Sequence, residues 1–159
     1  MTRSKLLNKK ILILGAGHEQ LPSIKLAKKL GLYVISVDKN KKCEGKFQSD
    51  EFVNMSVKET NNILKFIKKN QIRFFIAPCS DLAMKKLNII KRKLNHNNLS
   101  ANLVNICTNK FHMKKFFNRN KLNTSKYFTF DNYFDFKKKI KKLNLPCVIK
   151  PLSSFGQKG

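Results

Sequence analysis

The stretch ILILGAGHEQLPSIKLAKKLGLYVISVD, residues 11–38, contains the pattern that decides the fold. Ile11 to Leu14 form a continuous aliphatic run, which is typical of a strand covered on both faces. Gly15 to Gly17 predict a turn, and the helix that follows it ends at Gly31. Residues 33–38 predict a second strand that ends in an aspartate. The stretch therefore predicts a β-α-β unit with parallel strands.

The alternation of apolar strands and amphipathic helices continues to about residue 107. A short strand is predicted around Phe52 and Val53, a longer one over 72–77, and helices over 60–69 and 81–94. Strands that alternate with helices in this way predict an α/β fold, a Rossmann-like, doubly wound and mainly parallel sheet.

After residue 107 the pattern changes, and we expect a domain boundary near Thr108. The following segment predicts a helix over 110–120, a strand over 127–130, a helix over 132–143 and a final strand over 147–149. The first of these helices is expected to bury Met113, Phe116 and Phe117.

The chain of 159 residues is strongly basic, with 34 lysines and arginines, 9 aspartates and glutamates and a net charge of +25. Such a charge often indicates binding to nucleic acid. However, only 4 of the basic residues are arginines, the usual readers of bases, and the lysines are spread along the whole chain. We therefore expect no specific nucleic acid partner, and a nucleic-acid platform is kept as a third, non-enzymatic hypothesis.

The four cysteines are far apart and form no C-x-x-C pair, so neither a zinc site nor a disulfide framework is indicated. We expect buried thiols in a reducing compartment, the cytoplasm. No segment approaches the roughly 18 apolar residues of a membrane span, so no membrane partner is expected.

The glycine turn carries the first candidate site. A dinucleotide site requires G-x-G-x-x-G there and an acid at the end of the next strand. Gly15, Gly17 and Asp38 match this pattern, but Gln20 replaces the third glycine, and its bulk opposes the close approach of a pyrophosphate. The turn is still expected to expose N–H groups, and with Glu19 these residues are candidates for substrate binding. A nicotinamide-dependent Rossmann oxidoreductase or binding module remains the second hypothesis.

Ser80 and Asp81 follow the strand over 72–77, at the edge of the sheet where α/β proteins bind ligands. Either residue could simply cap the next helix. The two roles are compatible, so both residues are further candidates for substrate binding.

The last stretch, LPCVIKPLSSFGQKG at residues 145–159, carries the second candidate site. A short apolar strand ends at Lys150, and a loop of small residues follows. Glycines let backbone N–H groups approach phosphate oxygens, serine hydroxyls add donors, and the lysine supplies a positive charge. An ordinary turn with a solvated lysine has the same features, so this stretch does not decide the function alone.

Taken together, these segments resemble the start of an ATP-grasp enzyme. Residues 11–38 resemble the pre-ATP-grasp domain of the carbamoyl-phosphate synthase and biotin carboxylase group, and APCSDLA at 77–83 resembles its later strand-to-helix corner. The resemblance implies a pre-ATP-grasp domain over 1–108 and, over 109–159, the start of an α+β ATP-grasp nucleotide-binding domain, the first part of its lid subdomain. In place of the usual D-K pair of the family, the chain has Asn109-Lys110.

The resemblance also implies functions for individual residues. The residues expected to contact ATP are Lys110 and Lys150 at the phosphates, and Ser153, Ser154, Gly156 and Gly159 in the loop that folds over them. Such enzymes use ATP and Mg²⁺ to phosphorylate a small-molecule carboxylate, and an amine, ammonia or another nucleophile attacks the acyl phosphate.

The remaining functional groups of the family would lie beyond Gly159: the strand that contacts adenine, the glutamate and asparagine that bind magnesium, and the catalytic arginine. We therefore expect no catalytic residue and no metal ligand within residues 1–159, and no activity from this part alone. A homodimer of the full-length enzyme is left open.

Overall fold

The chain divides into two compact units, Met1–Asn98 and Leu99–Gly159, and the structure, a computed structural model, describes residues 7–153. The expected domain boundary near Thr108 lies inside the second unit and stays a prediction about the full-length protein. In chain order the elements are β1 (Lys10–Leu14), the 3₁₀ turn η2 (His18–Gln20), α1 (Leu21–Lys29), β2 (Tyr33–Asp38), α2 (Glu44–Gln48), β3 (Glu51–Asn54), α3 (Thr60–Lys69), β4 (Phe74–Ile76), α4 (Asp81–Lys93), α5 (Ala101–Thr108), α6 (Lys110–Arg119) and α7 (Tyr133–Ile140).

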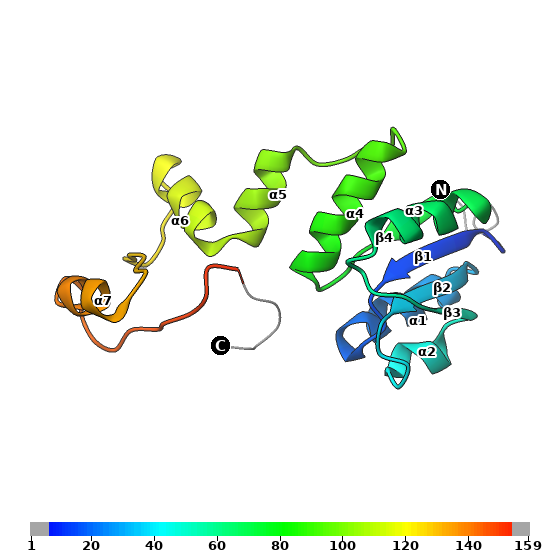
Figure 1. Cartoon of the computed structure of the whole chain (residues 1–159), viewed down its shortest axis with the longest axis horizontal. Helices are drawn as coiled ribbons and strands as arrows, with labels where there is room; N and C mark the ends of the chain where they lie inside the picture. Colours follow the sequence, from blue (N-terminus) through cyan, green and yellow to red (C-terminus); the bar gives the residue numbers. More distant parts are fainter. Residues whose placement is uncertain (1–6, 154–159) are drawn as a thin grey trace. The chain divides into compact units, whose positions relative to one another are not determined.

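The first unit is built on a four-stranded parallel sheet with the strand order β3-β2-β1-β4 (Figure 1). In the central strand, Leu12 is paired with Ile35 of β2 on one side and with Phe75 of β4 on the other. The predicted α/β class with a parallel Rossmann-like sheet is confirmed.

The side chains of β1 alternate between two cores, because successive residues of a strand point to opposite faces. Leu12 and Leu14 pack on the face covered by α3 and α4, whereas Ile11 and Ile13 pack on the face covered by α1. Helices on both faces explain why the strand is apolar at every position from Ile11 to Leu14. Burial of these side chains supplies the main stabilisation of the unit.

The strand order changes direction at the carboxyl end of β1. The strands β2 and β3 lie on one side of β1 within the sheet, and β4 lies on the other side of β1. Open α/β sheets bind ligands at such a point, where the strand order changes direction. The glycine turn follows β1 and the Ser80 corner follows β4, so the fold places both at this edge of the sheet.

The second unit contains α5, α6 and α7 and two extended segments (Figure 1). The helices expected over 110–120 and 132–143 are present as α6 and α7, while the short helices α2 and α5 were not predicted. The strands expected over 127–130 and 147–149 are not formed within the described residues. Both segments have strand-type side chains, but a strand also needs a hydrogen-bonded neighbour, and neither segment has one in this part of the chain.

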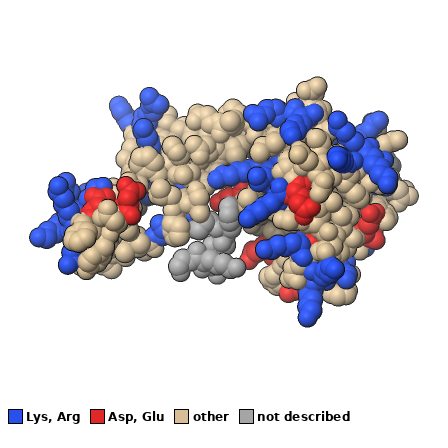
Figure 2. All heavy atoms as spheres, viewed as in Figure 1, with Lys and Arg blue, Asp and Glu red and all other residues tan. Residues whose placement is uncertain are grey.

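Burial in the second unit is shallower than the sequence suggests. Neither α6 nor α7 has a fully buried side chain, and Phe116, expected inward, is 40% exposed. The expectation of buried thiols holds for Cys43 but is wrong for Cys79 and Cys107, which are exposed. Basic side chains are spread over both units on the face drawn in Figure 2. Among the described residues, none of the helices has the length and apolarity that a membrane span requires.

Candidate functional site

The glycine turn after β1 is held by side chains of its own unit. Gly15 has a φ of +97°, a conformation that glycine adopts easily, and the chain turns there. The N–H of Ala16 donates to Asp38 Oδ2 (2.9 Å), and the N–H of Gly17 donates to Gln20 Oε1 (3.1 Å). The expectation that the turn exposes its N–H groups is therefore wrong for Ala16 and Gly17, because carboxylate and amide oxygens already occupy them.

The side chain of Gln20 connects the glycine turn to the segment after β4. Its side chain is 7% exposed, and its Nε2 donates to the carbonyl oxygen of Pro78 (2.9 Å) at the end of β4. The amide thus bridges the segments that follow β1 and β4. The bulk of Gln20 was expected to oppose a dinucleotide, but the bridge was not predicted, because nothing in the sequence relates Gln20 to Pro78.

The other candidate substrate residues of the first unit lie at the same edge of the sheet. Ser80 caps α4, since its Oγ accepts from the N–H of Ala83 (3.2 Å), and the partly exposed Asp81 lies in the first helical turn. Glu19 is exposed beside the glycine turn, whereas His18 contacts Glu44 through Nδ1 and Oε2 (3.0 Å). The structure thus brings the predicted residues of the first unit to one edge of the sheet, and their contact with a substrate stays a prediction.

In the second unit, Asn109 and Lys110 begin α6 as expected. Asn109 Oδ1 accepts from the N–H groups of Phe111 (3.0 Å) and His112 (3.1 Å), so the residue in place of the family's acid serves as the helix cap. Its Nδ2 lies 3.5 Å from Ser153 Oγ. The amide therefore performs the capping that an aspartate would perform, without its charge.

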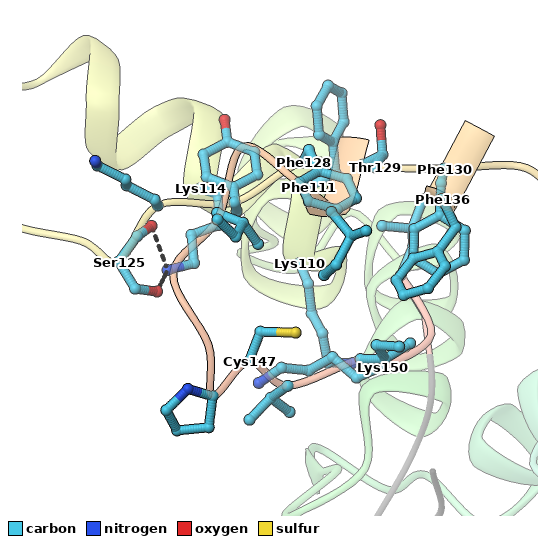
Figure 3. A pocket seen from close by; sticks show the side chains of 18 of the residues that line it. Lys110, Phe111, Lys114, Ser125, Phe128, Thr129, Phe130, Phe136, Cys147 and Lys150 are labelled. Carbon is cyan, nitrogen blue, oxygen red and sulfur yellow. Dashed lines mark hydrogen bonds between the residues drawn. The ribbon is translucent and has the colours of Figure 1, made fainter. Parts of the chain in front are cut away.

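Lys110 and Lys150 line the same cavity, which has a volume of about 520 Å³ (Figure 3). The phenylalanine rings of 111, 128, 130 and 136 lie on one side of it, and the segment with Cys147 and Lys150 faces them. Ser153 is exposed just after this segment. The other three predicted loop residues, Ser154, Gly156 and Gly159, lie outside the described residues.

Lys114 also lines this cavity and was not predicted. It follows Lys110 by one helical turn, and its Nζ donates to Thr124 Oγ1 and to Oγ of Ser125 (2.7 Å). The ammonium also lies 5.9 Å from the centre of the Tyr127 ring. Lys114 therefore ties the segment after α6 to the helix. The four-residue spacing of Lys110 and Lys114 places them on one face of a helix, and this signal could have predicted Lys114 as a second lysine of the cavity.

Within residues 7–153 the side chains of His, Cys, Asp and Glu form no group of three that could hold a metal ion. The site in the second unit is thus defined by cations and aromatic rings. A cavity with these properties suits an anionic ligand that also has an apolar or aromatic part.

The chain is similar to known proteins in both sequence and structure, although no family model matches it. It is 24% identical over 160 residues to a formate-dependent phosphoribosylglycinamide formyltransferase of Prochlorococcus marinus, a match that covers 100% of this chain and 41% of that protein. The solved structure of phosphoribosylglycinamide synthetase from Anaerococcus prevotii matches 87% of the chain and 36% of that protein, with 27% identity and a TM-score of 0.62.

A further solved structure has the same fold at lower identity. It is an N5-carboxyaminoimidazole ribonucleotide synthetase in complex with ADP, with a TM-score of 0.78, 20% identity, and coverage of 97% of this chain and 40% of that protein. The chain thus spans about two fifths of the length of the proteins it matches.

Proposed function

We propose that the chain belongs to the ATP-grasp enzymes, as its sequence predicted, and that it is the amino-terminal part of an ATP-dependent ligase. This ligase would activate a carboxylate as an acyl phosphate for attack by an amine or a similar nucleophile. The observation that carries the proposal is that Lys110 and Lys150, which are far apart in the sequence, line one cavity.

In this proposal each part of the cavity has a separate task. The ammonium groups of Lys110 and Lys150 bind phosphate oxygens, because phosphoryl transfer depends mainly on positioning and on neutralising charge. The aromatic side supplies an apolar surface for the rest of the nucleotide, and Ser153 begins the loop over the phosphates. Magnesium, when bound, would neutralise further phosphate charge, and we expect its ligands in the part of the full-length protein that follows this chain.

The edge of the sheet at the carboxyl ends of β1 and β4 is the proposed place for the substrate. Glu19 and Asp81 offer carboxylates there, while Ser80 is occupied in part by its capping bond. Gly15, Gly17 and Asp38 shape the turn. The named relatives differ in the compounds that they act on, so we assign only the class: a small carboxylate and an amine-type nucleophile. We place the enzyme in the cytoplasm, where ATP is available.

A nicotinamide-dependent function is less well supported. Its pyrophosphate would need the N–H groups of the glycine turn, and those of Ala16 and Gly17 are bound to Asp38 and Gln20. The relatives reported above also carry synthetase and transferase names.

The test is nucleotide binding by the full-length protein, measured by calorimetry and by ligand-induced thermal stabilisation. We expect ATP with Mg²⁺ to bind and to raise the unfolding temperature, and NAD to do neither. Stabilisation by NAD alone would exclude the proposal. Release of ADP that requires both a carboxylate and an amine would establish the ligase reaction.

A further inference from the structure

We propose that Gln20 is a positioning residue: its buried amide locks the glycine turn to the β4–α4 corner, and thereby holds the two segments that carry the proposed substrate residues in one geometry. That these segments bind a substrate rests on the proposed function. The lock itself is a property of the first unit and can be tested without any ligand.

Both the oxygen and the nitrogen of the Gln20 side-chain amide form hydrogen bonds within the first unit. Oε1 accepts from Gly17 N–H (3.1 Å), and Nε2 donates to Pro78 O (2.9 Å). The side chain is 7% exposed, so each of these groups would lose a partner with little access to water if the amide were absent. A buried amide with two such partners has one preferred orientation.

The glycine turn is shaped to accommodate this side chain. A Cβ atom added at Gly15 would lie 3.1 Å from Gln20 Cδ, closer than ordinary van der Waals contact, and the φ of +97° disfavours other residues there as well. Gly15 and Gln20 are therefore a matched pair. The glutamine occupies the space next to the turn that a third glycine would leave open to a pyrophosphate.

The two elements that Gln20 joins carry the proposed substrate residues. Glu19 is its direct neighbour, and Ser80 and Asp81 follow Pro78 by two and three positions. A change at Gln20 should therefore alter the spacing of Glu19 from Asp81, although Gln20 itself is too deeply buried to bind substrate. Cys79, which is exposed in the same corner, offers a chemical probe of that geometry.

The experiment compares Gln20→Met and Gln20→Glu with wild type in the full-length protein. Methionine keeps the length of the side chain without its hydrogen bonds. Glutamate keeps the acceptor for Gly17 N–H, but places a second oxygen against Pro78 O unless it is protonated. The rate of maleimide labelling at Cys79 is measured by peptide mapping between pH 5 and pH 8, with the exposed Cys107 of the other unit as the internal reference.

We expect Cys79 labelling relative to Cys107 to rise at least threefold in Gln20→Met, and amide exchange at Gly17 to accelerate. In Gln20→Glu the increase should be present at pH 8 and should fall at pH 5, because burial of the new carboxyl beside Pro78 O raises its pKa, and the protonated form can donate to that oxygen. Wild type is measured over the same range, since the ionisable side chains of His18, Glu19, Asp38, Glu44 and Asp81 lie near the glycine turn or the β4–α4 corner.

Relative labelling and exchange equal to wild type in both variants would overturn the inference, as would a pH-independent Gln20→Glu. If Gln20→Met does not fold, the pH response of Gln20→Glu decides alone. ATP binding is measured on the same samples. Its absence in wild type would defeat the proposed function and leave the lock unaffected.

Discussion

The backbone N–H of Lys110 donates to the carbonyl oxygen of Leu152, with 3.0 Å between the two atoms. Lys150 lies two residues before Leu152, so this bond fixes the beginning of α6 beside the segment that carries the second lysine. The two lysines line one cavity. A single long-range backbone contact therefore accounts for much of the arrangement of the proposed phosphate site.

Replacing these lysines should weaken ATP binding without unfolding the protein. We expect Lys110→Ala and Lys150→Ala each to reduce affinity for ATP with Mg²⁺ by about 10-fold or more in the full-length protein, since a hydrogen bond to a charged group contributes about 1.5–3 kcal/mol. The double variant should lose more. Calorimetric titration measures the effect, and Lys138→Ala, an exposed lysine of α7 outside the cavity lining, is the matched control. Normal binding by the double variant would contradict the assignment.

Lys114 should contribute to the site mainly by holding its wall. Its ammonium donates to Thr124 and Ser125, so Lys114→Met leaves their oxygens without this donor and frees the segment over 122–127. We expect faster hydrogen exchange in that segment, a loss of about 1–3 kcal/mol in the stability of the second unit, and a smaller loss of ATP affinity than in Lys110→Ala. Lys115→Met, at an exposed position next in sequence, should change none of these quantities. Unchanged exchange in Lys114→Met would show that the tether is not needed.

The parts of the fold that could be predicted from sequence are those determined by local patterns. β1, β2 and α3 have the expected positions because aliphatic runs and helical spacing act over a few residues. Lys110 and Lys150 were chosen as candidate phosphate ligands from the resemblance to a family, and the structure places both in one cavity. By contrast, the Gln20–Pro78 bond joins residues 58 positions apart, and no periodicity signals such a pair.

Local composition can also predict a strand that does not form, as it did twice in the second unit. Residues 127–130 and 147–149 have apolar or aromatic side chains at most positions, yet Val148 is 81% exposed and Ile149 is 58% exposed. Strand propensity reflects packing against neighbouring strands more than an intrinsic preference of the backbone. Composition therefore indicates that a segment suits a strand, but a partner decides whether the strand forms.

Gly45 should be far less tolerant of substitution than Gly17. A Cβ at Gly45 would lie 2.6 Å from the carbonyl oxygen of Ala16 and 2.8 Å from Cδ1 of Ile24, and the backbone oxygen cannot move without distorting the glycine turn. We expect Gly45→Ala to destabilise the first unit by about 1–3 kcal/mol, the range for overpacking. At Gly17 the added Cβ meets only Gln20 Oε1 at 3.4 Å, so Gly17→Ala is the control and should change stability by less. Urea unfolding of both variants measures this contrast, and equal stabilities would contradict the close approach.

The stability of the first unit should depend on Asp50 in a pH-dependent way. Asp50 Oδ1 accepts from Lys28 Nζ (2.7 Å) and Oδ2 accepts from the N–H of Val34 in β2 (2.8 Å). Partial burial of the carboxyl acts to raise its pKa, but the hydrogen bonds from Lys28 and Val34 outweigh it and hold the pKa below the usual value of 3.8. A lowered pKa in the folded state gives stability that is complete above the unfolded pKa and is lost as the pH falls through the folded one.

We therefore expect Asp50→Asn to be less stable than wild type by about 1–2 kcal/mol at pH 7, and the difference to shrink as the pH falls below about 4. Asparagine keeps one oxygen that can accept from the N–H of Val34, so the loss should come from the missing charge on that bond and from the Lys28 contact. The Lys28 contact should contribute little, because the Lys28 side chain is 44% exposed and solvent screens its charge. Urea unfolding between pH 7 and pH 3 measures the difference, with Asp131→Asn, an exposed aspartate of the second unit, as the control. A constant difference in the free energy of unfolding between Asp50→Asn and wild type over this pH range would contradict the prediction. It would show that the charge of the carboxylate does not stabilise the fold.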